Sequence, residues 1–366
     1  MKRVCHLTTV HPPFDTRIFP KMCKSLVSAG FEVHLVVTHE KDETVDGVRL
    51  HALPKPKNRI ERVMFSPKRC LRKAIKVDAE LYHFHDPELL AIGLKLKSLG
   101  KKVVYDVHEN HSGSMLDLGY MHPWLRVPIA RRIKRLENLA DGRLDSIISA
   151  TPAIARQFSN PAAVTVQNFP LDDEFADFGS TPQTRRARQF AFVGGVTRIR
   201  AAKEMVEAIG LVEDATLVIG GHFAPSSLED ELATCPGWSQ TKCLGWIDRD
   251  TMGGVLSESR AGLVLFLPAR NHIEAQPNKI FEYMAAGLPL IASHFPLWKE
   301  IVEGEGVGLT VDPEDSQAIA EAMRWILDHP EEADEMGRRG KAAVRSKYCW
   351  SAQEKILVDL YNRLVD

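Results

Sequence analysis

The sequence predicts an α/β protein with two doubly wound parallel sheets, one in each half of the chain. In both halves short apolar runs, which suit buried strands, alternate with segments of helical periodicity, and this alternation is typical of βα units. A length of 366 residues suits two domains of ordinary size. The charge also divides the chain, since residues 1–178 carry 27 basic and 21 acidic side chains, whereas residues 179–366 carry 20 and 27. We therefore expect a domain boundary at 178/179, inside the polar, irregular stretch 171–188.

The first half opens with a β-loop-α-β unit. Two apolar strands are expected on either side of a helix over residues 18–29, which the fourfold spacing of Ile18, Met22 and Leu26 predicts. The loop before this helix contains two prolines and no glycine. Because no Gly-x-Gly-x-x-Gly follows the first strand, a dinucleotide-dependent oxidoreductase is disfavoured.

Two later strands of the first half end in polar residues. The strand 79–84 runs into His85 and Asp86, and the strand 102–107 runs into His108. In open α/β sheets, ligands bind beyond the carboxyl ends of the strands. A structural role is the usual default for a lone histidine at a strand end. Two such ends in adjacent βα units nevertheless favour a functional role for His108, and leave both roles open for His85 and Asp86.

Two basic segments lie in the first half. Lys55 to Lys76 holds nine lysines and arginines against one acid, Glu61, and Arg126 to Arg135 mixes cations with apolar side chains. Such segments suit an anionic membrane surface, with a solvated basic face as the alternative. Nucleic acid is disfavoured as a partner, because no stacking aromatics interleave in the first segment and no nucleic-acid motif is visible.

The cysteines and the N-terminus favour a cytoplasmic protein, peripheral at the inner face of the membrane if it contacts one. The six cysteines form no Cys-x-x-Cys pair, which suits reduced thiols. The first apolar segment ends at His11-Pro12-Pro13, so we interpret it as a strand and not as a signal peptide. No apolar run approaches the ~20 residues that cross a bilayer.

Glycines and cations follow the first strand of the second half. The strand 190–193 ends in Gly194-Gly195, where the absence of side chains lets a ligand approach the backbone. Arg198 and Arg200 come next and suit an anion; a glycine turn with surface arginines is the alternative. Further on, Asp248-Arg249-Asp250 could bind a metal, but we prefer an Asp N-cap for the helix that follows.

The most informative stretch begins at Glu274 and ends at Pro289. Pro277 suits a first helical position, and Gly287 suits the residue that terminates the helix. Glu274 then lies in the preceding loop and Glu282 in the second helical turn. The helix N-terminus favours an anion, and Lys279 adds a full positive charge there. Because each carboxylate can accept hydrogen bonds from a diol, the stretch suits a phosphate ester flanked by sugar hydroxyls.

This stretch resembles the nucleotide-sugar site of the family 4 retaining glycosyltransferases, which have a Glu-x7-Glu signature followed by a small-residue helix and Gly-x-Pro. The resemblance implies the GT-B architecture, with two Rossmann-like domains and an interdomain cleft. It further implies an acceptor-side domain over 1–178, a donor domain over 179–349, and a final helix, 350–366, that packs back on the first domain. The first loop departs from the family pattern because it lacks glycine, although its Asp15-Thr16-Arg17 is familiar in bacterial polysaccharide members.

The resemblance also assigns roles to individual residues. Glu274 would approach the donor sugar, Glu282 would hold the ribose, and His108 would align sugar and acceptor. The donor-binding residues would be Gly194, Gly195, Arg198, Arg200, Trp246, Ile247, Glu274, Asn278, Lys279, Ile280 and Glu282. The acceptor-side residues would be Asp15, Arg17, His85, Asp86 and His108. Arg200 and Lys279 would stabilise the leaving diphosphate, and the resemblance implies no metal; capping is an alternative for Asp15.

We therefore expect a nucleotide-sugar-dependent hexosyltransferase that acts in cell-surface polysaccharide or lipopolysaccharide biosynthesis. The donor would be a UDP or GDP sugar, the acceptor a glycan or a lipid-linked glycan, and no cofactor is expected. A sugar-nucleotide epimerase or hydrolase of the same fold is the first alternative, and a non-catalytic binding protein is the second.

Overall fold

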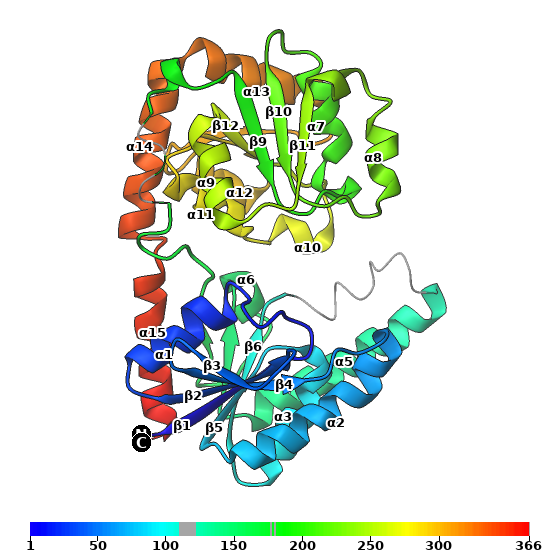
Figure 1. The fold of residues 1–366 in the computed structure, drawn as a ribbon, viewed down its shortest axis with the longest axis vertical. Coiled ribbons are helices and arrows are strands. Elements are labelled where there is room, and N and C mark those ends of the chain that lie inside the picture. Colours follow the sequence, from blue (N-terminus) through cyan, green and yellow to red (C-terminus); the bar gives the residue numbers. More distant parts are fainter. Residues whose placement is uncertain (110–121, 176–177, 179–180, 366) are drawn as a thin grey trace. The chain divides into compact units, whose positions relative to one another are not determined.

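The computed structural model describes residues 1–109, 122–175, 178 and 181–365, and the chain folds into two compact units (Figure 1). The first unit comprises residues 1–168 and 350–366, and the second comprises 169–349. Residue 179, at the expected boundary, lies outside the described residues. No described helix is both long and apolar enough to cross a bilayer.

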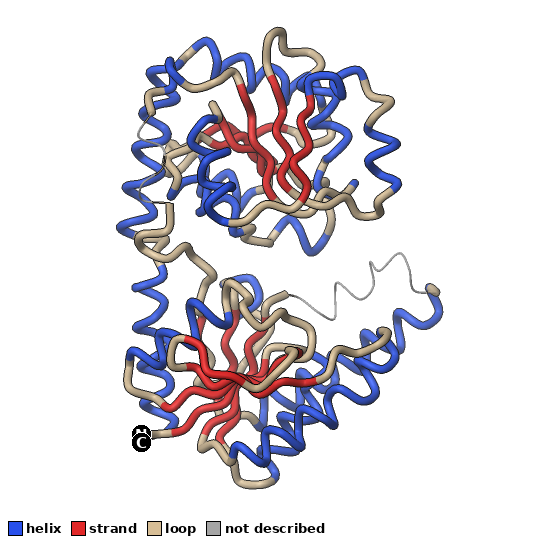
Figure 2. Tube along the Cα trace, viewed as in Figure 1, coloured by secondary structure: helices blue, strands red, loops and turns tan. Residues whose placement is uncertain are grey.

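The described strands of the first unit form one eight-stranded sheet in the order β3-β4-β2-β1-β5-β6-β7-β8 (Figure 2). Every described pair is parallel except β3 with β4. The strands are β1 (Arg3–Leu7), β2 (Glu32–Thr38), β3 (Glu43–Val45), β4 (Val48–Leu53), β5 (Leu81–Phe84), β6 (Lys102–Val107), β7 (Ser146–Ser149) and β8 (Val164–Thr165). The helices are η1 (Ile18–Cys23), α1 (Lys24–Ser28), α2 (Arg59–Val77), η2 (Pro87–Leu89), α3 (Leu90–Ser98), α5 (Pro123–Arg143), α6 (Pro152–Ala155) and α15 (Trp350–Val365).

The C-terminal helix α15 packs on the first unit. The indole Nε1 of Trp350 donates a hydrogen bond to Ser25 Oγ at 2.9 Å. The hydroxyl of Tyr361 lies 2.6 Å from His83 Nδ1 and 3.0 Å from His6 Nε2. Trp350 and Tyr361 are buried, so the helix completes the core of this unit.

The second unit contains a six-stranded, all-parallel sheet in its described residues, in the order β11-β10-β9-β12-β13-β14. The strands are β9 (Gln189–Val193), β10 (Thr216–Gly220), β11 (Thr241–Gly245), β12 (Ala261–Val264), β13 (Leu290–Ser293) and β14 (Gly308–Val311). The longer helices are α7 (Ala202–Ile209), α8 (Ser227–Leu232), α9 (Arg249–Glu258), α11 (Asn278–Ala285), α12 (Pro296–Val302), α13 (Ser316–Asp328) and α14 (Pro330–Ser346). The short ones are η4 (Gln183–Arg185), η5 (Arg198–Arg200), η6 (Pro236–Gln240) and α10 (Arg270–Ile273).

Helix α11 ends as its sequence predicts. Gly287 adopts a positive φ of 65°, and its N–H donates to Met284 O at 3.0 Å. The N–H of Leu288 reaches back to Tyr283 O at 2.9 Å, which completes a Schellman motif. At the other end Pro277 is the N-cap and not the first helical residue, so the helix begins one position later than expected.

Three further elements differ from the sequence-based expectations. The helix predicted over 18–29 starts as a π-helix, η1, which contains Pro20 and so lacks one N–H donor. The β3–β4 hairpin was not predicted, although Asp46-Gly47, both with positive φ, is a typical hairpin turn. The short helix α10 precedes Glu274, in a stretch where a loop was expected.

Candidate functional site

In the second unit, glycines follow the carboxyl ends of two neighbouring strands. Gly194 follows β9 with a φ of 129°, and Gly221 follows β10 with a φ of 159°. A Cβ on Gly221 would lie 2.0 Å from Gly194 O, and a Cβ on Gly194 would lie 2.7 Å from Lys279 Cε. A side chain would therefore clash at Gly194 or at Gly221, and Lys279 occupies the space beside Gly194.

The amine of Lys279 is buried, although part of its side chain reaches solvent. Its Nζ lies 3.7 Å from the centre of the Phe192 ring and has no hydrogen-bond partner among the described residues. Burial, together with the nearby positive charge of Arg200, holds the lysine pKa well below its ordinary value, and Glu282 opposes this shift. A buried amine without a hydrogen bond is costly in the free protein, so the position suits an anionic ligand.

The two arginines after β9 have different environments. Arg200 donates from Nη1 to Gly195 O at 2.7 Å, and its guanidinium lies 5.5 Å from the Phe266 ring centre. Arg198 instead forms an ion pair with Glu231 of helix α8. The structure thus brings Arg200 to Gly195, while Arg198 pairs with Glu231.

Glu282 is held by an arginine that sequence reasoning did not select. Arg249 Nη1 lies 2.8 Å from Glu282 Oε1, and the same guanidinium pairs with Glu174. The Phe175 ring centre lies 4.9 Å from the guanidinium. Glu282 is largely buried, so this contact fixes where its carboxylate lies. The sequence signal for Arg249 was weak, because it lies between Asp248 and Asp250, and that pattern suggested a metal site or an N-cap.

The remaining residues predicted for the donor site lie in three places. Asn278 and Ile280 are in the first turn of α11, where Ile280 is buried. Glu274 is exposed at the end of α10. Trp246 is 70% exposed after β11, and Ile247 packs beside Gly220, where a Cβ would come within 2.5 Å of its Cδ1.

The preferred interpretation of Asp248, an N-cap, is confirmed. Its Oδ1 accepts a hydrogen bond from Thr251 N at 2.8 Å, so it is the N-cap of α9.

In the first unit, the polar strand ends meet at the carboxylate of Asp106. Arg17 approaches it in a bidentate pair, with Nε 2.9 Å from Oδ2 and Nη2 2.8 Å from Oδ1. His108 Nε2 and His85 Nδ1 lie 2.9 and 3.1 Å from the same Oδ2. Burial alone would raise the pKa of Asp106, but Arg17 and the histidines hold it well below its ordinary value. Arg17 and His85 are buried, whereas His108 is partly exposed.

The other acceptor-side residues lie in the loop after β1 and at the end of β5. Asp86 is buried and accepts hydrogen bonds from the hydroxyls of Thr8 and Thr9. Asp15 accepts hydrogen bonds from the N–H groups of Arg17 at 2.9 Å and Ile18 at 3.1 Å, although the N-cap of η1 is Arg17, and it lies 3.2 Å from His11 Nδ1. Burial opposes ionisation of Asp15, but the contact with His11 lowers its pKa below the ordinary value.

Among the described residues, two groups of side chains have possible metal-ligand atoms within 4.8 Å of one another: His6, His83 and His85, and His85, Asp106 and His108. Both lie in the first unit. Within them, however, the close contacts are hydrogen bonds, which occupy most of the lone pairs that a metal ion would need.

The sequence matches two glycosyltransferase profiles, one in each unit. The profile described as Glycosyltransferase Family 4 matches residues 20–166, and the one described as Glycosyl transferases group 1 matches residues 187–329. The chain therefore belongs to the family 4 retaining glycosyltransferases, and its two parallel α/β sheets are those of the GT-B fold. This confirms the predicted family and fold class.

Individual relatives are distant. D-rhamnosyltransferase WbpZ of Pseudomonas aeruginosa is 24% identical to this chain over 218 residues. The matched region covers 56% of this chain and 56% of the length of WbpZ, just over half of each. Sucrose-phosphate synthase from Thermosynechococcus elongatus has a TM-score of 0.76 at 18% identity, over 100% of this chain and 99% of that one. Anabaena HepE in complex with UDP-glucose has a TM-score of 0.76 at 10% identity, over 99% and 100%.

Proposed function

We propose that this protein is a nucleotide-sugar-dependent hexosyltransferase that retains the anomeric configuration. The observation that supports this most directly is the buried amine of Lys279, which has no hydrogen-bond partner among the described residues and lies beside Gly194. A diphosphate would supply the missing negative charge and hydrogen-bond acceptors. A complex of HepE with UDP-glucose supports the same class of donor, and UDP and GDP sugars are the two that we propose.

The second unit provides the donor-binding residues in this proposal. Lys279, Arg200 and the N-terminal turn of α11 stabilise the charge that develops on the leaving diphosphate. Glu282, held by Arg249, accepts hydrogen bonds from the ribose hydroxyls, and Glu274 approaches the sugar. Gly194 and Gly195 allow the phosphates to approach the backbone, while Trp246 and Ile247 border the base.

The first unit provides the acceptor side. His108 is partly exposed and contacts the sugar and acceptor, whereas Arg17, His85 and Asp86 are buried and support the site from within. The reaction needs no covalent nucleophile and no metal, because positioning and leaving-group stabilisation supply the catalysis. We propose a glycan or lipid-linked glycan of cell-surface polysaccharide or lipopolysaccharide as acceptor; the distant similarity to a rhamnosyltransferase supports this class.

Contact with the inner face of a membrane is part of the proposal. Helix α2 exposes Ile60, Met64 and Phe65, which are 74%, 58% and 53% exposed. A hollow of about 520 Å³ lies along the same helix, and its lining consists of Ala52, Leu53, Pro54, Arg69, Arg72, Lys73, Ile75 and Lys76. Apolar side chains next to cations suit the headgroup region of an anionic bilayer. The cations of Arg126 to Arg135, on α5, would add to this attraction.

Calorimetry with UDP, GDP and ADP sugars tests the donor proposal, and incubation with glycan acceptors tests transfer. We expect one nucleotide diphosphate sugar to bind and to release nucleotide only when an acceptor is added. Nucleotide release without any acceptor would instead support the epimerase or hydrolase alternative. Binding to none of these donors would overturn the proposal and favour a non-catalytic protein. Sedimentation with anionic liposomes tests the membrane contact, which should weaken at high salt.

A further inference from the structure

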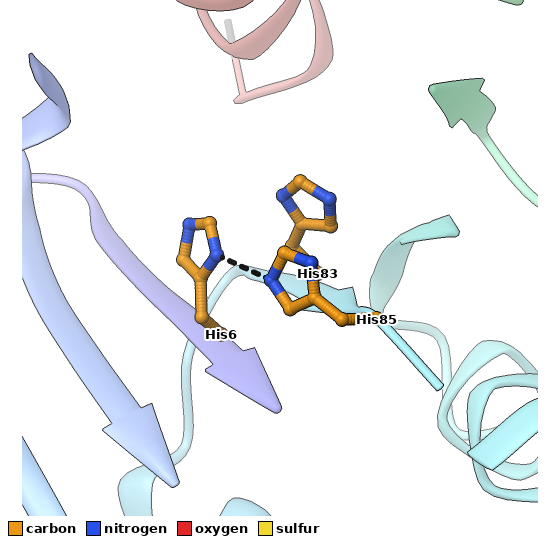
Figure 3. Close-up of side chains that lie close together, drawn as sticks. All are labelled: His6, His83 and His85. Carbon is orange, nitrogen blue, oxygen red and sulfur yellow. Dashed lines mark hydrogen bonds between the residues drawn. The ribbon is translucent and has the colours of Figure 1, made fainter. Parts of the chain in front are cut away.

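Three buried imidazoles lie next to one another in the first unit, and we call them the histidine cluster: His6, His83 and His85 (Figure 3). His6 on β1 pairs in register with His83 on β5, and His85 directly follows β5. His6 Nδ1 lies 3.0 Å from His85 Nε2. The hydroxyl of Tyr361 lies between two members of the cluster, 3.0 Å from His6 Nε2 and 2.6 Å from His83 Nδ1.

The Asp106 carboxylate fixes the direction of the hydrogen bonds that connect it through His85 and His6 to Tyr361 and His83. An ionised carboxylate only accepts, so His85 Nδ1 and His108 Nε2 must both donate to it. A neutral His85 then has a free lone pair on Nε2, which accepts from His6 Nδ1. His6 Nε2 in turn accepts from the Tyr361 hydroxyl, whose oxygen accepts from His83 Nδ1. All the protons therefore point toward Asp106.

The ionisation states agree with this assignment. Burial holds the pKa of His6 and of His83 well below the ordinary value, and it lowers the pKa of His85. Burial also raises the pKa of Tyr361, so the phenol keeps its proton. In the described part of the chain, His83 Nε2 is the only cluster nitrogen without a hydrogen bond, although it lies 4.0 Å from Asp106 Oδ2. One lone pair does not bind a metal ion that needs three or four ligands, so a hydrogen-bond chain explains the cluster better than a metal site.

We propose that Asp106 is a positioning residue, held by Arg17 and His85, that keeps the proton of His108 on Nε2. The Nδ1 lone pair of His108 is then the acceptor for a substrate hydroxyl. The role of that lone pair rests on the proposed transferase function, whereas the tautomer of His108 is a property of the free protein.

Nitrogen-15 NMR of the histidine-labelled full chain tests the tautomer directly, because the two ring nitrogens of a neutral imidazole differ in shift. A His108→Gln variant identifies the His108 signals. We expect the proton on Nε2 of His108, and the proton on Nδ1 of His85. In Asp106→Asn, we expect a population of the other His108 tautomer and a roughly 10- to 100-fold loss of kcat, by analogy with residues that orient metal-bound histidines. Binding of the donor nucleotide, which uses the second unit, stays within about twofold.

Tyr361, which is separated from Asp106 by His6 and His85 in the series of hydrogen bonds, provides a matched control. Tyr361→Phe removes the hydroxyl between His6 and His83, so the signals of those two histidines should shift. The tautomer of His108 should stay as it is, because Asp106 fixes it. A proton on Nδ1 of His108 in the unaltered protein would overturn the proposal, even if Asp106→Asn does not fold. Stoichiometric zinc in the purified chain, lost from a His6→Gln variant, would also overturn it. A correct tautomer with no transferase activity would leave the tautomer standing and refute only the proposed function.

Discussion

Replacing Lys279 by methionine should stabilise the free protein and weaken donor binding at the same time. The buried Nζ has no hydrogen-bond partner among the described residues and lies against Phe192 and next to Gly194. A buried donor left without a partner costs about 1–3 kcal/mol, and methionine removes the donor while keeping most of the volume. At about 2–4 °C per kcal/mol for a unit of this size, the unfolding midpoint should rise by several degrees.

The same substitution should weaken the binding of a nucleoside diphosphate. A hydrogen bond to a charged group contributes about 1.5–3 kcal/mol, which corresponds to a Kd that is roughly 10- to 150-fold weaker. Calorimetry with UDP and with uridine separates the phosphate contact from the base contact, since uridine should bind both proteins equally. Lys299→Met is the control, because Lys299 is 58% exposed and should change neither quantity. A less stable Lys279→Met protein, or one with unchanged affinity for UDP, would refute this reasoning.

Three other changes have definite expectations. Arg249→Met leaves Glu282 without its partner, so nucleotide affinity should fall about tenfold and stability by roughly 1–3 kcal/mol, measured by calorimetry and urea unfolding. Gly194→Ala places a Cβ 2.7 Å from Lys279 Cε at a φ of 129°, so the thermal shift produced by UDP should disappear. Lowering the pH from 6.5 to 5.5 should destabilise the protein, because the histidines of the cluster bind protons in the unfolded chain but stay neutral in the folded protein. The Glu137 pKa, raised by burial to about 7, opposes this, so Glu137→Gln should steepen the loss.

The sign and size of the pH effect follow from the two kinds of shift. Each histidine of the cluster has a folded pKa below its unfolded value of about 6.5, so its contribution falls by up to about 1.4 kcal/mol per pH unit below 6.5. Glu137 binds its proton in the folded state first, so its contribution rises by up to about 1.4 kcal/mol per unit as the pH falls from 7. Counting only the three cluster histidines and Glu137, the net loss is about 3 kcal/mol per pH unit at most. Stability that is constant or increases toward pH 5.5 would contradict the neutral, buried cluster.

Matched controls are present in the chain for Arg249→Met and for Gly194→Ala. Arg338 also pairs with a glutamate, Glu335, but is 73% exposed, so Arg338→Met should leave affinity and stability unchanged. Gly254 has nothing within 4 Å of a Cβ placed on it, so Gly254→Ala should keep the thermal shift with UDP. Equal effects in Arg249→Met and Arg338→Met would mean that Arg249 does not orient Glu282.

Local sequence signals predicted the elements whose causes are local. Helix α11 ends at Gly287 because a glycine adopts positive φ at no steric cost, and the pattern of its neighbours already marks the end. Asp248 caps α9 because a short acceptor three residues before a free N–H is sufficient. Pro20 was an equally local signal, but the fourfold apolar spacing around it obscured the π-helical start of the first helix.

Contacts between distant segments could not be predicted in the same way. Tyr361 meets His83 from 278 positions away, and Arg249 meets Glu282 from 33 positions away. Nothing in the residues around Arg249 indicates a partner on another helix. The polar strand ends did indicate that His85 and His108 meet, because parallel strands place their carboxyl ends at one edge. They did not indicate Asp106, which lies inside its strand and is buried.

The contrast between the two units explains why Lys279 is the strongest indicator of a ligand. In the described part of the chain, several charged side chains have a buried atom without a hydrogen bond, but the arginines and acids among them have other polar atoms. Arg17, for example, keeps two bonds to Asp106 although its Nη1 has none. A lysine side chain has one nitrogen, so the side chain of Lys279 has no hydrogen bond to any described residue. Most polar groups around Asp106 hydrogen-bond to one another in the free protein, whereas the amine of Lys279 would gain hydrogen bonds when an anion binds.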